Sequence, residues 1–215
     1  MFMGCTSLST APALPATTLA DNCYYAMFEY CTSLTACPTL PADTAATSCY
    51  MRMFQGCTSI STLPALPITA LANYCYAHMF DSTSINSIPS DYLPIEVLAD
   101  SCYWDMFDSC ECLSSVPVNL LSSTTLADDC YESMFEYCTN LTNVPNLPAT
   151  ELAAWCYCEM FYGCTSLSTV PTNLLPAAVA VERCYYDMFG ECSALTQAPD
   201  LPATTLDDEC YYKMF

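Results

Sequence analysis

Apolar residues recur at four-residue spacing near the start of the chain. Leu19, Cys23 and Met27 fall at i, i+4 and i+8, and Tyr24 and Phe28 lie on the adjoining stripe. This spacing predicts an amphipathic helix of about ten residues. A helix that short is not stable alone in water, so we expect it to pack against neighbouring elements.

The start of this predicted helix carries a capping pattern. Thr18 stands at the N-cap position and Asp21 follows three residues later, after a proline that lies just outside the helix. A threonine followed three residues later by an acid indicates a helix N-terminus. The same spacing recurs at Thr125/Asp128 and Thr205/Asp208.

A different pattern follows the predicted helix. Leu34, Cys37 and Leu40 are apolar, and Pro38 and Pro41 directly follow the last two of them. Because proline cannot donate a hydrogen bond to a neighbouring strand, this pattern predicts a turn and then a strand of two or three paired residues.

The whole pattern repeats along the chain, and a Met-Phe pair marks its phase. The pair begins at Met1, Met27, Met53, Met79, Met106, Met134, Met160, Met188 and Met214, so consecutive pairs lie 26 to 28 residues apart. We therefore predict one continuous solenoid of eight repeats over residues 1–215, in which each unit contacts only its neighbours. Since both ends fall in phase, we interpret the sequence as a window of a longer array.

The charge balance excludes two classes of partner. Three basic residues face 23 acidic ones, for a net charge of −20. Binding to nucleic acid or to anionic lipid requires cationic side chains, so we expect neither. No run of 18 apolar residues occurs, so we expect no membrane insertion in this segment. Calcium bound by the acidic side chains is a weak alternative, and we otherwise expect no cofactor.

Fifteen of the 18 cysteines fall in two columns, one before the recurring tyrosine and one after the Met-Phe pair. Helical rise separates Cys23 from Cys31 too far for a disulfide, whereas Cys31 and Cys49 meet across one step between units. A ladder of disulfides between units therefore has these candidates: Cys5–Cys23, Cys31–Cys49, Cys57–Cys75, Cys110–Cys130, Cys138–Cys156, Cys164–Cys184 and Cys192–Cys210. The ladder would require an oxidising compartment.

Two alternatives to the disulfide ladder stay open. The cysteines can be free thiols, stacked along the solenoid as small buried hydrophobic side chains. Metal binding is the weaker alternative, because the chain has no CxxC motif and its one histidine, His78, has no partner motif. We interpret His78 as a variable surface position and expect no metal ligands.

Catalytic chemistry has no recognisable motif in this chain. A nucleophile–histidine arrangement would have to use His78, and the acids at the helix starts complement the helix dipole. We expect no enzyme activity. The recurring tyrosine is interpreted as a flank of the core whose hydroxyl reaches water. Variable positions ahead of the prolines are the candidates for partner binding, and we call them the polar face: Thr10, Thr62, Ser87, Ser115, Asn143, Thr169 and Gln197.

The segments "MFMGCTSLSTAP", "MFQGCTSISTLP" and "MFYGCTSLSTVP" resemble the BspA-type leucine-rich repeat of bacterial, phage and protist surface proteins. The resemblance implies an α/β repeat solenoid: a right-handed, leucine-rich-repeat-like superhelix with one short parallel strand and one short helix per 26–28-residue unit. It also implies surface display, adhesion and partner binding without catalysis.

These observations lead to one functional expectation and one alternative. We expect a non-catalytic extracellular or cell-surface array that serves as a structural stalk, a filament or an adhesive scaffold. Its partners would be a protein or glycan surface, or further copies joined end to end. The alternative is a receptor module specific for one protein or glycan.

Overall fold

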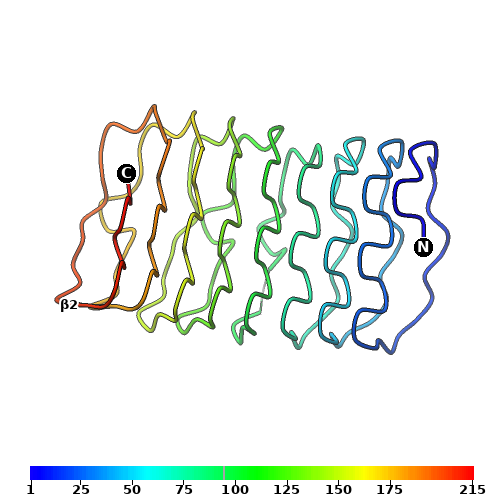
Figure 1. Cartoon of the computed structure of the whole chain (residues 1–215), viewed down its shortest axis with the longest axis horizontal. Coiled ribbons are helices and arrows are strands. Elements are labelled where there is room, and N and C mark those ends of the chain that lie inside the picture. Colours follow the sequence, from blue (N-terminus) through cyan, green and yellow to red (C-terminus); the bar gives the residue numbers. More distant parts are fainter. Residues whose placement is uncertain (94) are drawn as a thin grey trace.

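The computed structural model describes residues 1–93 and 95–215. The chain forms coils that lie side by side in sequence order, from the N-terminal coil at one end to the C-terminal coil at the other (Figure 1). We call each coil a rung. Main-chain hydrogen bonds join residues in adjacent rungs, as in the 2.9 Å bond from Phe2 N–H to Met27 O. The predicted repeat solenoid is confirmed, whereas the hand of the superhelix stays a prediction.

Consecutive tight turns replace the predicted helices. The N–H of Cys23 bonds Ala20 O at 3.1 Å within its own rung, and the next N–H, that of Tyr24, bonds Cys49 O at 3.0 Å in the following rung. This alternation continues along the segment. Because every second amide is used between rungs, no i→i−4 ladder can form, and the described residues contain no helix.

These turn segments share one side of the solenoid, which we call the turn face. They cover residues 22–31, 48–57, 74–83, 101–110, 129–138, 155–164, 183–192 and 209–215.

The turns explain why the sequence resembled a helix. Every fourth residue has a positive φ, as at Asn22 (58°) and Ala26 (50°). The resulting four-residue period buries two side chains and turns the next two outward: Cys49 and Tyr50 are buried, whereas Arg52 is partly exposed. A four-residue period lies close to the 3.6 residues of a helical turn, so the two patterns coincide over ten residues.

The strands have the predicted length of two residues but lie elsewhere in the unit. Strand β1 (Val179–Ala180) pairs in parallel with β2 (Thr205–Leu206), and isolated parallel bridges join Thr44 to Ala70 and Thr125 to Glu151. All of these positions precede the first cysteine column, where a helix start was predicted. The pre-proline segments carry inter-rung bonds of their own, such as Thr142 N–H to Ser114 O, without forming a described strand.

The predicted capping acids bind the following rung instead of a helix end. Asp21 Oδ1 accepts the N–H of Thr47 at 3.0 Å, and Asp128 Oδ1 accepts that of Ala154 at the same distance. The predicted partner of these acids, the N-terminus of their own helix, was therefore wrong. The acid still satisfies a backbone amide, but the amide lies 26 residues further along the chain.

Identical side chains stack through the core. Phenylalanine rings lie nearly parallel at centroid distances of 5.5 to 5.9 Å, from Phe2 to Phe215. A second stack joins Tyr24 to Tyr211 at 5.5 to 6.0 Å. Burial of these large rings is the main source of stability in a rung that has almost no regular secondary structure.

The tyrosine stack corrects one prediction. The hydroxyls of Tyr50 and Tyr76 are buried and find no hydrogen-bond partner among the described residues, although they were expected to reach water. Each ring is 1% exposed. The tyrosine column therefore belongs to the core, and neither Tyr50 nor Tyr76 offers a platform for stacking a sugar.

No helix among the described residues is long and apolar enough to cross a membrane.

Candidate functional site

The cysteine columns are the most regular chemical feature, and all 18 cysteines are free thiols in the structure. The second column bonds to the phenylalanine stack: Cys57 Sγ donates to Phe28 O at 3.0 Å, in the preceding rung. The same contact recurs for Cys31, Cys110, Cys138, Cys164 and Cys192. The disulfide ladder between the two columns stays a prediction.

Burial keeps these thiols protonated. It raises the pKa of Cys57 to about 12 and that of Cys49 to about 11, mainly by desolvating the thiolate. A neighbouring cysteine of the same column raises both values further. Because the thiolate is the nucleophile and the metal ligand, the buried columns are suited to neither role. Within residues 1–93 and 95–215, no three His, Cys, Asp or Glu side chains are placed to hold a metal ion.

The polar face is open to solvent at six of its seven positions. Thr10, Thr62, Ser87, Ser115, Thr169 and Gln197 are exposed. Asn143 differs, because its side chain bonds both the N–H of Val116 at 3.0 Å and its carbonyl oxygen at 2.8 Å. Asn143 thus joins two rungs and is less available to a partner. Partner binding by the other six positions stays a prediction.

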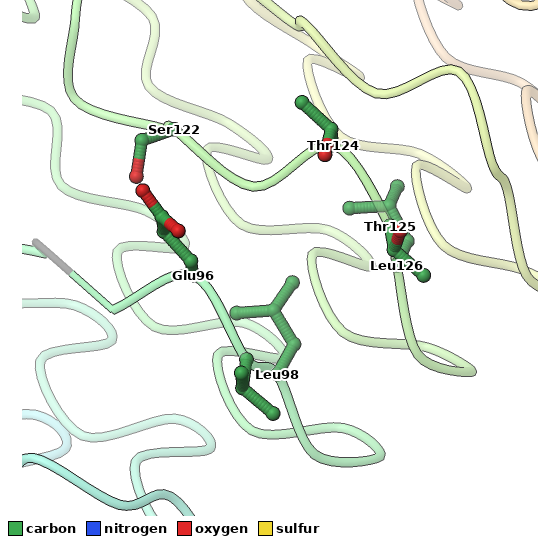
Figure 2. Close-up of a pocket in the computed structure, with 7 residues that line it drawn as sticks. Glu96, Leu98, Ser122, Thr124, Thr125 and Leu126 are labelled. Carbon is green, nitrogen blue, oxygen red and sulfur yellow. The ribbon is translucent and has the colours of Figure 1, made fainter.

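Longer loops beside the polar face create two shallow hollows. The first, of about 400 Å³, lies between residues 96–98 of one rung and 122–126 of the next. Figure 2 shows Glu96 pointing toward Ser122, with Leu98 below them and Leu126 beside Thr125. The second, of about 350 Å³, is lined by residues 146–148 and by Pro171, Asn173, Leu174 and Pro176. The first hollow lies between two units that carry inserted residues, and the second lies between a 26-residue unit and a 28-residue unit.

The turn face carries a group of buried and half-buried acids. Burial raises the pKa of Asp105 to about 9 and that of Asp108 to about 7. Repulsion between neighbours adds to both shifts, chiefly from Asp108 on Asp105 and from Asp81 on Asp108. These carboxyls are therefore partly protonated near neutral pH, and the turn face carries less charge than the sequence implies.

His78 lies inside this acidic group, so its interpretation as a surface position was wrong. It is 8% exposed and packs against Trp104, with ring centroids 4.6 Å apart. Its Nδ1 lies 3.2 Å from Asp105 Oδ2 and 3.7 Å from Asp81 Oδ2. Both imidazole nitrogens are shielded from solvent. A general base has to reach its substrate, and this imidazole is closed to one.

Comparison with known proteins gives only a distant likeness. No family model and no curated protein matches the chain. Among solved structures, the chain is similar to a leucine-rich repeat protein from Bacteroides ovatus, with 16% identity and a TM-score of 0.38, over 99% of this chain and 66% of that one. It is also similar to the leucine-rich repeat protein TpLRR of T. pallidum, with 16% identity and a TM-score of 0.35, over 93% of this chain and 72% of that one. At these scores the likenesses carry no argument about function.

Proposed function

We propose that the chain is a non-catalytic scaffold, displayed outside the cell, whose polar face adheres to a protein or glycan surface. The observation that carries the proposal is the uniform stack of rungs. Each rung repeats the same buried rings and the same inter-rung bonds, so small exposed side chains recur at a fixed spacing along one side.

The chemistry of the polar face fits broad adhesion better than recognition of one ligand. Its exposed members are threonine, serine and glutamine, which hydrogen-bond without imposing charge. Specific interfaces depend on buried tryptophan, tyrosine or arginine anchors, which this face does not supply at its described positions. Adhesion would then arise from many weak contacts along the array.

A bead-adhesion assay tests the proposal. Beads coated with the chain are flowed over protein-coated and glycan-coated surfaces. Thr62→Lys, Ser115→Lys and Thr169→Lys together should reduce retention severalfold, because they place charge and bulk on the polar face. The matched control, Thr17→Lys, Thr150→Lys and Thr204→Lys, adds the same charge at exposed positions elsewhere.

Equal retention by the two triple variants would overturn the role of the polar face. Surface display is tested separately, by labelling intact producing cells with an antibody or a membrane-impermeant biotin reagent. Labelling only after the cells are lysed would overturn the extracellular placement.

A further inference from the structure

A third hollow, on the turn face, is lined by a different set of residues. It measures about 330 Å³ and is formed by Tyr74, Ser101, Trp104, Asp129, Glu132 and Trp155, which come from four consecutive rungs. The chain contains two tryptophans, and both line this hollow. Its volume lies at the small end of the range for ligand sites, so it fits a small group.

Aromatic rings bound the hollow in two places. Tyr74 meets Trp104 edge to face, with centroids 6.4 Å apart and planes at 66°. Trp155 lies two rungs beyond Trp104, and neither indole is fully buried. Both indoles are partly exposed, and the face of an indole attracts cations more strongly than any other side-chain ring.

Two carboxyls lie in the rung between the tryptophans. Asp129 and Glu132 both line the hollow and both are half-buried. Burial, with repulsion from Asp129, raises the pKa of Glu132 to about 8, and burial with repulsion from Asp128 raises the pKa of Asp129. Neither carboxyl has an ion-pair partner in the described part of the chain. Near neutral pH Glu132 is therefore largely protonated when no ligand is bound, and a cation that enters the hollow favours the ionised form of both carboxyls, which no basic residue in the described part of the chain neutralises.

One wall of the hollow already contacts a cationic side chain of the protein itself. The guanidinium of Arg183 lies 4.4 Å from the ring centroid of Trp155 and pairs with Glu209. Arg183 comes from the following rung and does not line the hollow. The indole of Trp155 is thus placed where a cation–π contact forms within the fold.

We propose that this hollow binds an alkylammonium group, held between Trp104 and Trp155 and neutralised by Asp129 and Glu132. The group could be the trimethylammonium of a choline headgroup or the ammonium of a lysine side chain, which share this chemistry. A neutral sugar would use the aromatic walls but would leave the two carboxyls without a counter-charge. The site is independent of the polar face and of adhesion through it.

Tryptophan fluorescence reports on this site selectively, because both tryptophans line it. Choline, Nα-acetyl-lysine amide and the neutral choline isostere 3,3-dimethylbutanol are titrated at constant ionic strength. We expect a saturable change in fluorescence with both cations. The isostere should bind at least about tenfold more weakly, because it keeps the shape but loses the charge. The relative affinities of choline and the lysine amide identify the source of the ammonium group.

Two variants and one control complete the test. Glu132→Gln and Trp104→Ala should each weaken cation binding about tenfold, with Trp155 as the remaining reporter in the second case. Tyr212→Ala removes an exposed aromatic ring of the same face outside the hollow and should leave binding unchanged. Melting curves confirm that each variant is folded.

Three results would overturn the proposal. They are no saturable response to either cation, equal binding of the neutral isostere, and unchanged binding by Glu132→Gln. A saturable response to neutral sugars with none to choline or the lysine amide would replace it with a glycan site.

Discussion

Thr83 and Cys110 share one backbone acceptor. Thr83 Oγ1 donates to Phe80 O at 2.7 Å, Cys110 Sγ donates to the same oxygen at 3.2 Å, and the two side chains lie 3.4 Å apart. Thr83 occupies the position that the second cysteine column holds in other rungs. In other rungs the cysteine at this position donates to the phenylalanine carbonyl of the preceding rung, as Cys57 does to Phe28 O, whereas the Thr83 hydroxyl donates to the carbonyl of its own rung.

This contact predicts different outcomes for two substitutions. Thr83→Cys should change the free energy of unfolding by less than about 1 kcal/mol, because a thiol fits this column elsewhere. Thr83→Val should lower it by about 1 kcal/mol, through loss of one buried hydrogen bond while Cys110 still satisfies the carbonyl. Urea titration measures both. Equal destabilisation by the two variants would contradict the shared-acceptor arrangement.

The phenylalanine stack should be most sensitive in its middle. Phe107 is fully buried and stacks on Phe80 and Phe135, each 5.8 Å away. Phe107→Ala should lower the free energy of unfolding by about 3–5 kcal/mol, because it removes a large ring and leaves a cavity. Tyr137→Ala, at a ring that is 41% exposed, is the control and should have a much smaller effect in the same denaturation experiment.

Gly163 makes room for an aromatic side chain of the preceding rung. A Cβ at this position would overlap the ring of Tyr137. Gly163→Ala should therefore lower the free energy of unfolding by about 1–3 kcal/mol. Gly4→Ala has a similar φ but open space around its Cβ, so it isolates the backbone contribution. Adding Tyr137→Ser to Gly163→Ala should restore most of the lost stability. If it does not, the destabilisation comes from the backbone conformation at position 163 and not from the overlap with Tyr137.

Stability should fall as the pH rises from 5 to 9. The pKa of Asp105 is raised to about 9 and that of Asp108 to about 7 in the folded chain, so the folded state binds more protons than the unfolded state. A raised carboxyl pKa contributes stability below the unfolded value and loses it as the pH passes the folded value. Asp105→Asn should raise Tm at pH 8 by about 2–4 °C or more and change it little at pH 5. A gain of equal size at both pH values would contradict this origin.

Thiol alkylation followed by intact-mass measurement distinguishes the two arrangements of the cysteines. In native protein we expect fast labelling at the exposed thiols of Cys5, Cys23 and Cys112. After denaturation without reductant, the free thiols of the structure predict 18 labels. A total of about four would instead establish the ladder of seven disulfides and an oxidising compartment.

The repeat phase and the buried columns could be predicted from the sequence, because each depends on side-chain type at fixed spacing. Met27, Phe28 and Cys31 mark the same columns in the sequence and in the structure. The backbone between them could not be predicted. Its left-handed positions are occupied by residues such as Ala26 and Trp155, which do not favour a positive φ, so no local signal distinguishes the turns from a helix.

The candidate sites were missed for a related reason. Taken alone, His78 was interpreted as a variable surface position, and Trp104 and Asp105 were assigned no role. Their meeting depends on the inter-rung step, which brings residues 26 or 27 positions apart into contact. Exposure of the polar-face positions, by contrast, could be predicted one residue at a time, and six of the seven are exposed.

The inter-rung bonding has a consequence for how such a chain can change in length. Each rung presents to the next the same row of rings and carbonyls that it meets in the one before it. Deleting or duplicating one whole unit by recombination would therefore join surfaces that already match, whereas inserting or deleting a single residue on the turn face would shift the inter-rung bonds of that segment out of register. Length can thus vary between related genes in steps of one unit while the local structure stays the same.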